Sequence, residues 1–449
     1  MRAEGIASTP NWPAIMENEH APSRALPAPG LLGAARSSET PCQTAAKAKP
    51  LKAPLIWHII TCEFPPQSGG VSDYAHLVAN GLASLGDEVH VWCPERDQTA
   101  PQAGHVNVYA TLGKFAPSDL RATGRALDRF PGPLRLLVQW VPHGYGYKSL
   151  NLPFCIWLSY RKWHHGDQVD LVVHEPFLPF KKGKWRQNAA AIMHRVMMMV
   201  LLRTADRVWL STPAWEKMIR PFSLGRRHTY NWLPLPSNVP VVEDPAAAWA
   251  IHAKYSPKGF LIGHFGTFGS PITPILQAIV PPLLRRTEHA SLILIGPRSS
   301  GFRDRLVQEH PDLAKRIHAV GPIDARDVRL SAHIRSCDLM IQPYPDGVTS
   351  RRTSVMAALA HARPTVSTSG PLTEPFWDSS GAVALAPAGD NEAFVESALR
   401  ILGDPQHRSS LGEAAGKFYR REFDVERIIE RLRAIDQGAE PGWAEPKGR

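Results

Sequence analysis

The sequence lacks the cysteine spacing that a disulfide framework or a structural zinc site requires. Its five cysteines are scattered and none belongs to a CxxC pair. It also lacks a run of the roughly 18 to 20 apolar residues that a spanning helix needs, and its first residues lack the apolar core of a signal peptide. These absences argue against a membrane-spanning or disulfide-stapled protein, and they predict a protein of the reducing cytoplasm.

Composition describes an ordinary globular chain with a basic bias. Of its 449 residues, 43% are hydrophobic and 20% are charged, so a sizeable core is available. The 51 Lys and Arg residues outnumber the 41 Asp and Glu residues, and the formal charge of +10 favours anionic partners such as nucleotide phosphates, anionic lipids or nucleic acid. No nucleic-acid recognition motif accompanies this charge, so we expect no nucleic-acid partner.

Strand-like and helical patterns alternate along the chain in two successive sets, which predicts two α/β domains with parallel, doubly wound sheets. The apolar runs of the first set lie at 55–60, 88–93, 135–141, 169–174 and 207–211, and those of the second at 260–265, 291–295, 318–320, 339–343, 364–367 and 382–386. The predicted divisions are a disordered extension (1–50), an N-terminal Rossmann-like domain (51–242), a linker (243–258), a C-terminal Rossmann-like domain (259–420), a terminal helix (421–436) packing back toward the first domain, and a tail (437–449).

A glycine pair separates the first strand from the first helical pattern. Gly69 and Gly70 follow the apolar run 55–60 and precede apolar residues at helical spacing over 71–85. Without Cβ atoms, such a turn lets backbone N–H groups approach an anion at the positive end of the helix. The pair predicts a phosphate cradle, although a tight strand-to-helix turn also uses glycine for structure alone.

These residues resemble the N-terminal signature of the bacterial family 4 glycosyltransferases of the GT-B fold. The matching residues are Phe64, Pro65, Pro66, Gly69, Gly70, Asp73 and Tyr74, then His174-Glu175-Pro176, and the likeness extends over roughly 55–436. The resemblance implies two Rossmann-like domains facing each other across a cleft, with a nucleotide-diphosphate-sugar donor held mainly by the second domain and an acceptor held mainly by the first. It also implies retention of configuration and no metal or other cofactor. No Asp-x-Asp motif occurs in the chain.

The chain departs from that family at its C-terminal hallmark, two glutamates separated by seven residues. The expected helix and turn are present over 355–364, but the glutamate positions fall on Thr349 and Ala357. An Asp-Gly-Val-Thr-Ser-Arg-Arg segment at 346–352 stands in their place. The chain therefore resembles a variant branch that recognises its donor differently.

Arg351 and Arg352 are the predicted phosphate ligands. They lie at the start of a helix expected from about Ser350 to His361, where free N–H groups favour an anion. Guanidinium groups bind phosphate oxygens in bidentate fashion and stabilise the charge that develops as the sugar–phosphate bond breaks. We therefore predict both to be catalytic; the alternative is a solvated basic turn.

His174 ends a buried strand, and the resemblance implies that it contacts the transferred sugar. Its predicted catalytic role is positioning and charge complementarity, with a structural core histidine as the alternative. The predicted donor-binding residues are Gly69, Gly70, Gly266, Thr267, Arg298, Asp346, Thr349, Ser350, Thr353, Ser354 and Glu374. Asp346 and Glu374 are candidates for hydroxyl contacts, and Asp346 could equally cap a turn.

Acceptor binding is predicted at Asp73 and Tyr74 of the signature and at His143 and Tyr145 of an aromatic, glycine-containing loop. Ordinary loop packing is the alternative for the last two. Basic residues at 181–186 precede a Met- and Leu-rich helix over 192–202, which is compatible either with peripheral contact with the inner face of an anionic membrane or with a core helix that has a basic end.

The function expected from these features is transfer of a sugar from a nucleotide-diphosphate-sugar to a hydroxyl of a glycan or lipid-linked acceptor, in polysaccharide, lipid-linked or glycoconjugate biosynthesis. Two alternatives stay open. One is a catalytically degenerate sugar-nucleotide or glycan-binding protein, suggested by Thr349 and Ala357. The other is a sugar-nucleotide epimerase on the same architecture, for which the acid and base carboxylates cannot be placed.

Overall fold

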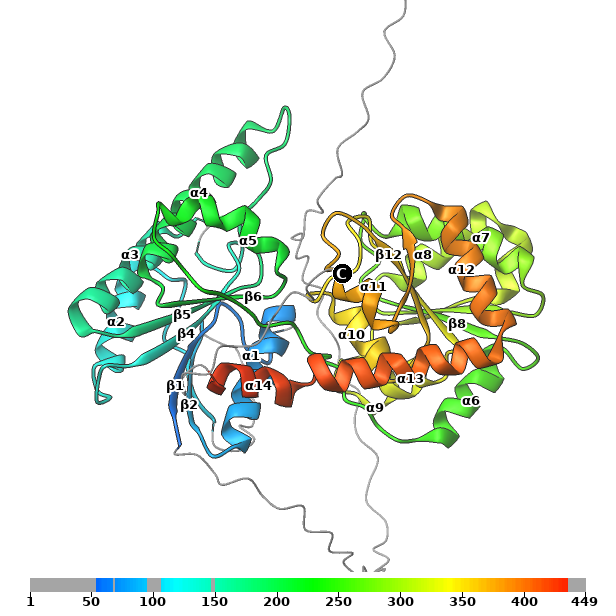
Figure 1. Cartoon of the computed structure of the whole chain (residues 1–449), viewed down its shortest axis with the longest axis horizontal. Coiled ribbons are helices and arrows are strands. Elements are labelled where there is room, and N and C mark those ends of the chain that lie inside the picture. Colours follow the sequence, from blue (N-terminus) through cyan, green and yellow to red (C-terminus); the bar gives the residue numbers. More distant parts are fainter. Residues whose placement is uncertain (1–53, 68, 95–105, 147–149, 435–449) are drawn as a thin grey trace, which may run out of the picture.

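The computed structural model describes residues 54–67, 69–94, 106–146 and 150–434. The expected extension 1–50 and tail 437–449 lie outside the described residues. Two entirely parallel sheets form two lobes, with helices on both faces of each sheet (Figure 1). The α/β prediction of two doubly wound, Rossmann-like domains is confirmed.

The first sheet has seven strands in the order β3-β2-β1-β4-β5-β6-β7. Its strands are β1 (Ile56–Ile60), β2 (Glu88–Trp92), β3 (Val106–Tyr109), β4 (Arg135–Trp140), β5 (Gln168–Val173), β6 (Arg207–Leu210) and β7 (Tyr230–Trp232). The order reverses between β1 and β4, and a doubly wound sheet opens a crevice at the carboxyl ends of the strands at such a point. Sequence patterns missed β3 and β7, which are short strands at the two edges.

Helices cover both faces of this sheet. They are α1 (Gly70–Ser84), α2 (Pro117–Leu127), α3 (Leu152–Tyr160), a π-helical turn at Arg161–His165, α4 (Trp185–Thr204), α5 (Ala214–Ile219) and a 3₁₀ turn at Arg220–Ser223. Strand residues alternate between two cores, as buried parallel strands must. Leu136 and Val138 pack with α3 and α4 in one core, whereas Leu137 packs with α1 in the other.

The second sheet has six strands in the order β10-β9-β8-β11-β12-β13. They are β8 (Leu261–Phe265), β9 (Ser291–Ile295), β10 (Ile317–Gly321), β11 (Leu339–Gln342), β12 (Thr365–Ser369) and β13 (Ala384–Pro387). Here the order reverses between β8 and β11. The second domain therefore repeats the topology of the first and has its own crevice at the ends of these two strands.

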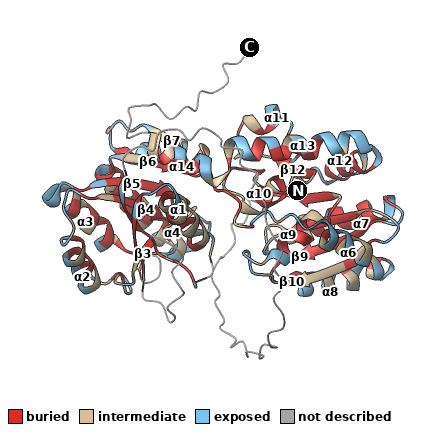
Figure 2. Cartoon of the chain, turned by 90° about the horizontal axis from the view of Figure 1, so that it is seen from below, coloured by how far each residue is buried: buried red, intermediate tan, exposed pale blue. Residues whose placement is uncertain are grey.

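The helices of the second domain also lie on both faces of their sheet. They are α6 (Pro245–Tyr255), α7 (Thr273–Arg286), α8 (Ser299–Glu309), a 3₁₀ turn at Pro311–Arg316, α9 (Val328–Arg335), α10 (Thr353–Ala360), α11 (Phe376–Ser380), α12 (Asn391–Gly403) and α13 (Pro405–Glu422). Helices α7 and α12 pack together, as do α10 and α13. Figure 2 shows the buried strands enclosed by helices whose outer sides are exposed.

The chain passes between the domains twice. Leu233 still hydrogen-bonds to β6, whereas Val239 is buried in the second domain, so the first crossing lies between them. Helix α6, in the segment expected to be a linker, packs against α9 of the second domain. After α13 the chain returns, and α14 (Val425–Ala434) packs against α1 in the core of the first domain (Figure 1). None of the helices in the described part of the chain combines the length and apolarity that crossing a bilayer requires.

Buried histidines make the fold sensitive to acid. Burial lowers the pKa of His58 to about 3, and the nearby His90 and Arg161 lower it further in the same direction. Burial likewise lowers the pKa of His264 and of His361 to about 4. Because an unfolded histidine takes up its proton near pH 6.5, acid favours the unfolded chain below that pH.

We therefore expect the free energy of unfolding to fall between about pH 6.5 and 4, by roughly 1.4 kcal/mol per pH unit for each such histidine. The measurement is the melting temperature across overlapping buffers. His361→Gln should make the dependence on pH shallower, whereas the control His289→Gln, at a largely exposed histidine, should not. A melting temperature that stays constant from pH 7 to 5 would contradict the expectation.

Candidate functional site

Polar side chains from the carboxyl ends of both sheets meet where the two domains touch. The first domain contributes residues that follow β4, β5 and β6, and the second contributes residues that follow β11 and β12. The ring centre of Trp215, in α5, lies 5.2 Å from the guanidinium carbon of Arg351, which belongs to the other domain. The switch-point crevices of the two sheets thus share one polar junction.

Arg351 and Arg352 form a clamp around one carboxylate. Arg351 donates to Asp346 Oδ2 at 3.0 Å, and Arg352 donates to Asp346 Oδ1. Both guanidinium groups are largely buried, and Arg352 lies 4.5 Å from the ring centre of Tyr344. Helix α10 begins at Thr353, three residues later than expected, and Arg352 is its N-cap residue. The pair is therefore an ordered, inward-facing cationic group and not a solvated turn.

Burial lowers the pKa of Arg351 to about 10, and the neighbouring charge of Arg352 acts in the same direction. Asp346 and Glu175 act against this lowering. Two adjacent cations thus face two carboxylates, so a further anion would bind the arginines by displacing one of them. The buried Nε of Arg352 has no hydrogen-bond partner among the residues that the structure describes.

Glu175 and His143 form a second ion pair beside the clamp, with 3.4 Å between His143 Nε2 and Glu175 Oε2. Burial works to raise the pKa of Glu175, but the hydrogen bond from His143 and the electrostatic effects of His143 and Arg351 lower it. Glu175 is therefore ionised at neutral pH. The predicted acceptor residue His143 is partly exposed at this junction.

His174 is held as a neutral imidazole at the end of β5. Its Nε2 lies 2.8 Å from Gln139 Oε1, and its ring meets Tyr74 edge-on with 4.8 Å between ring centres. Burial lowers its pKa to about 4, so it carries no charge at pH 7. Because Gln139 Oε1 is an acceptor, Nε2 must carry the proton, and His174 is positioned but not charged.

Glu374 connects the two domains and is not open to a ligand. Its carboxylate accepts hydrogen bonds from Thr212 Oγ1 at 2.7 Å, from the backbone N–H of Ser350 at 3.0 Å, from Ser350 Oγ at 2.5 Å and from Trp377 Nε1 at 2.8 Å. Burial raises its pKa, and these hydrogen bonds act against the rise. The predicted ribose contact is therefore corrected: Glu374 is an interdomain acceptor whose oxygens are already engaged.

Ser350 is part of the same interdomain contact. Its hydroxyl oxygen lies 2.7 Å from the carbonyl oxygen of Ser211 and accepts from Trp232 Nε1 at 3.1 Å, and its carbonyl accepts from the N–H of Leu235. Ser350 and Thr349 are fully buried, so neither is available to the donor as predicted. Two further residues of this segment were predicted to bind the donor. Thr353 begins α10, and the hydroxyl oxygen of Ser354 lies 2.8 Å from that of Tyr344.

The glycine turn before α1 is already filled by a carboxylate of the chain itself. Glu63 Oε1 accepts from the backbone N–H groups of Val71 and Ser72, each at 3.0 Å. A Cβ on Gly69 would lie 2.2 Å from this oxygen, so a larger residue there would displace the Glu63 carboxylate. Gly70 is the first residue of α1. The predicted phosphate cradle is therefore occupied by Glu63, whose pKa is raised by burial.

The loops after β8 and β9 are tightly interlocked. A Cβ on Gly296, which has φ 126°, would lie 2.2 Å from the Gly266 carbonyl oxygen. Arg298, the residue before α8, adopts a left-handed conformation with φ 66° and donates from Nε to the Thr267 carbonyl at 3.1 Å. Phe268 is left-handed as well, with φ 53°. Strained backbone of this kind concentrates at ligand sites.

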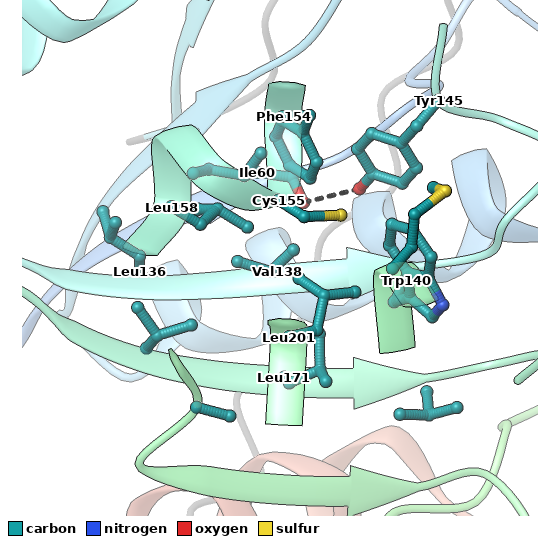
Figure 3. Close-up of a cluster of buried hydrophobic side chains, with 14 of the residues drawn as sticks. Ile60, Leu136, Val138, Trp140, Tyr145, Phe154, Cys155, Leu158, Leu171 and Leu201 are labelled. Atoms are coloured by element: carbon teal, nitrogen blue, oxygen red, sulfur yellow. Dashed lines mark hydrogen bonds between the residues drawn. The ribbon is translucent and has the colours of Figure 1, made fainter. Parts of the chain in front are cut away.

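Two predicted acceptor residues lie in the core instead. Tyr145 is fully buried, donates to the Gln139 carbonyl at 2.6 Å and packs among Ile60, Trp140 and Phe154 (Figure 3). Tyr74 is also buried, beneath His174. Neither side chain is available to an acceptor, which corrects both predictions. Asp73 accepts from Asn238 Nδ2 of the interdomain crossing at 2.8 Å.

Sequence patterns missed several residues that organise this junction. Trp215 and Thr212 follow β6, where the sequence has no motif, and Gln139 lies within the apolar run 135–141, where nothing singles it out as a partner of His174. Glu63 immediately precedes the recognised signature, and an acid shortly before a glycine pair was the available signal. Within the described ranges, no group of three or more His, Cys, Asp or Glu side chains is arranged as a metal site.

Replacing one oxygen of Glu374 by an amide nitrogen should weaken the domain junction. In Glu374→Gln a donor would face the donors Trp377, Thr212 or Ser350, and a buried group left without its partner costs roughly 1–3 kcal/mol. We expect a clearly lower melting temperature by calorimetry. The control Glu392→Gln, at an exposed ion pair with Arg286, should leave it nearly unchanged. Equal melting temperatures for Glu374→Gln and the unmodified protein would show that these hydrogen bonds do not hold the domains.

Comparisons with known proteins agree with the architecture. Residues 259–404, most of the second domain, match the family model described as Glycosyl transferases group 1. A search of the curated proteins by sequence finds no match.

Three solved structures share the fold of the whole described chain. The sucrose-phosphate synthase of Thermosynechococcus elongatus superposes with a TM-score of 0.66 at 17% identity, covering 86% of this chain and 98% of that one. Anabaena HepE in complex with UDP superposes with a TM-score of 0.60 at 15% identity, covering 86% of this chain and 100% of that one. A trehalose-phosphate synthase of Burkholderia xenovorans in complex with glucose-6-phosphate superposes with a TM-score of 0.60 at 12% identity, and it covers the same shares of the two chains as HepE does. The protein has the GT-B fold, and its second domain matches a glycosyltransferase family.

Proposed function

We propose that the protein transfers a sugar from a nucleotide-diphosphate-sugar to a hydroxyl group, with retention of configuration and without a metal ion. The donor lies mainly on the second domain and the acceptor on the first. Acceptors of polysaccharide, lipid-linked or glycoconjugate assembly fit this scheme. The family match over 259–404 supports the class of reaction. Anabaena HepE, crystallised with UDP and with UDP-glucose, supports a nucleotide sugar as donor.

The observation that carries the proposal is the clamp of Arg351 and Arg352 around Asp346 at the domain junction. These two cations follow β11 at the switch point of the domain that matches the family, where a doubly wound sheet binds its ligand. A diphosphate fits two guanidinium forks better than one carboxylate does, because it has more oxygens and more charge. Asp346 is then released toward hydroxyl groups of the donor.

The chain's own groups account for the steps of the transfer. As the sugar–phosphate bond breaks, negative charge collects on the leaving phosphate, where the clamp stabilises it. His174, neutral and fixed by Gln139, donates no charge and serves to position the sugar. The acceptor hydroxyl attacks from the side of the leaving group, and its proton passes to the departing phosphate.

A second candidate function is binding of a sugar nucleotide without turnover. It is favoured by Thr349 and Ala357, which stand at the positions of the family's two glutamates and are both fully buried. With Glu374 also engaged in the junction, Asp346 is the one predicted carboxylate that stays near the clamp. Turnover separates this candidate from the first.

The first test is a thermal-shift screen against UDP, GDP, ADP and TDP with CMP as a monophosphate comparison, followed by sugar release from the matching nucleotide sugars. We expect stabilisation by one diphosphate and slow hydrolysis of its sugar conjugate, because a bound ligand raises stability by mass action. Binding without release would favour the second candidate. The absence of both would contradict any sugar-nucleotide function.

Arg351→Ala should reduce sugar release roughly 100- to 1,000-fold, the scale of losing one preorganised donor to a developing charge. The measurement is the rate at saturating donor, with melting temperature recorded in parallel. Arg329→Ala, at an exposed arginine paired only with Asp327 among the described residues, is the control and should keep full activity. Unchanged release from Arg351→Ala would remove the phosphate clamp from the mechanism.

His174→Ala separates a positioning role from a structural one. If His174 positions the sugar, turnover falls while the melting temperature stays close to that of the unmodified protein. Gln139→Leu removes its hydrogen-bond partner and should lower turnover in the same direction but less. A collapse of the melting temperature in His174→Ala would mark the residue as structural instead.

A further inference from the structure

One buried side chain contacts both His174 and Arg351, although these two residues belong to different domains. Trp215 lies in α5, shortly after β6, and is buried in the core of the first domain. Its indole Nε1 donates to the carbonyl of His174 at 3.1 Å, and its ring centre lies 5.2 Å from the guanidinium carbon of Arg351. The indole therefore connects the residue proposed to position the sugar with a residue proposed to hold the leaving phosphate.

The first domain fixes this indole through the segment that follows β6. The N–H of Ser211 donates to the carbonyl of Val173 at 3.3 Å, and the N–H of Trp215 donates to the carbonyl of Thr212 at 3.1 Å. Thr212 Oγ1 donates in turn to Glu374 of the second domain at 2.7 Å. The segment that places Trp215 is thus the segment that joins the two domains.

The contact with Arg351 holds a cation without offering it an anion. A guanidinium group within about 6 Å of the centre of a tryptophan ring is attracted by the π-electrons of the ring, most strongly where water is excluded. Arg351 is largely buried, and the carboxylates that face it, Asp346 and Glu175, are groups with which an incoming phosphate competes. A phosphate does not compete with the indole, so Trp215 keeps Arg351 in place while the anion changes.

The contact with His174 acts on the end of β5. The carbonyl of His174 accepts from Trp215 Nε1 and, at 3.3 Å, from Ser211 Oγ. This carbonyl belongs to the peptide that leads to Glu175, whose charge acts on Arg351. Holding that peptide therefore places the imidazole of His174 and the carboxylate of Glu175 relative to the same guanidinium group.

We propose that Trp215 is a positioning residue for the transfer, because it sets Arg351 and His174 relative to each other across the domain boundary. This inference rests on the proposed function, since it assigns Trp215 a role in that same site. The indole acts through Arg351 on the diphosphate and through His174 on the sugar. The alternative is a tryptophan that only fills the core, for which both contacts are incidental.

Two substitutions at position 215 separate the two contacts. Trp215→Phe keeps an aromatic ring beside Arg351 but removes the N–H donor to His174. We expect sugar release at saturating donor to fall roughly 2- to 10-fold, the scale of one net hydrogen bond, with the dissociation constant of the nucleoside diphosphate nearly unchanged. Trp215→Leu removes the ring as well, and the affinity for the diphosphate should then fall about 10-fold or more.

The measurement is titration calorimetry with UDP and UMP, or with the di- and monophosphate of whichever base stabilises the protein in the thermal-shift screen. A clamp on the diphosphate favours UDP over UMP, so Trp215→Leu should reduce the ratio of the two affinities, whereas Trp215→Phe should keep most of it. Sugar release from the corresponding nucleotide sugar is followed in the same preparations. A purely structural role would lower stability without changing this ratio.

The orientation of Arg351 can also be followed without any nucleotide. Phenylglyoxal reacts with accessible guanidinium groups, and mass spectrometry of the digested protein gives the rate of reaction at Arg351. Because the indole packs against this side chain, Arg351 should react several-fold faster in Trp215→Leu than in the unmodified protein. In Trp215→Phe the rate should lie between the two.

Trp209 supplies matched controls. It lies in β6, is fully buried and packs in the other core of the first domain. Its Nε1 has no hydrogen-bond partner among the described residues. Trp209→Phe and Trp209→Leu therefore remove the same atoms from a buried tryptophan. They should lower the melting temperature but leave the ratio of UDP to UMP affinity and the reaction rate at Arg351 unchanged.

The inference fails if Trp215→Leu keeps both the ratio of affinities and the reaction rate at Arg351, or if Trp209→Leu changes them equally. Either result would make Trp215 a core residue only, in a protein that still binds the diphosphate. An unmodified protein that binds none of the diphosphates and releases no sugar would instead overturn the proposed function, and the role of Trp215 with it. The two failures are told apart by the unmodified protein alone.

Discussion

The contact between the two domains is organised around one buried carboxylate. Glu374 lies in the second domain, yet one of its hydrogen-bond donors, Thr212, follows β6 of the first. A buried carboxylate is costly unless its oxygens are satisfied, and Glu374 has four donors. The arrangement that satisfies it also sets Ser350 against Ser211 and Trp232, and so fixes Arg351 next to Trp215. The clamp has its geometry because this junction is closed.

Two anion-binding positions of the junction are filled by the chain's own carboxylates. Glu63 takes the N–H groups at the start of α1, and Asp346 takes the two arginines. Both positions would otherwise concentrate unpaired donors or positive charge in a protein whose formal charge is already +10. A diphosphate that binds as proposed would compete with a carboxylate and not with water, so selectivity would rest on its greater charge and number of oxygens.

Much of the fold could be predicted from the sequence, because alternation of buried strands and helices is a local pattern. Runs such as 291–295 predicted their strands to the residue, whereas β3 and β7 each have an asparagine between apolar residues and therefore show no continuous apolar run. The functional site was harder to predict from the sequence than the fold. Arg351 and Arg352 were visible as a motif, but Asp346 between them could equally have been a turn residue. Tyr145 belongs to an aromatic loop that looked exposed, and only the packing of Trp140 and Phe154 reveals it as core. Glu374 has a role that depends on contacts across 162 positions of sequence, which no local pattern encodes.

The two passages of the chain between the domains lie next to each other. Ser237, in the first passage, donates its backbone N–H to the hydroxyl of Tyr419 at 3.0 Å, and Tyr419 lies in the last turn of α13, just before the second passage. Two adjacent connections act as a pivot, because separating the domains would stretch both, whereas tilting one against the other stretches neither. Helix α14 would travel with the first domain, to whose core it belongs, and α13 with the second. A tilt of the two lobes about the Ser237–Tyr419 contact is therefore the relative motion that this connectivity permits.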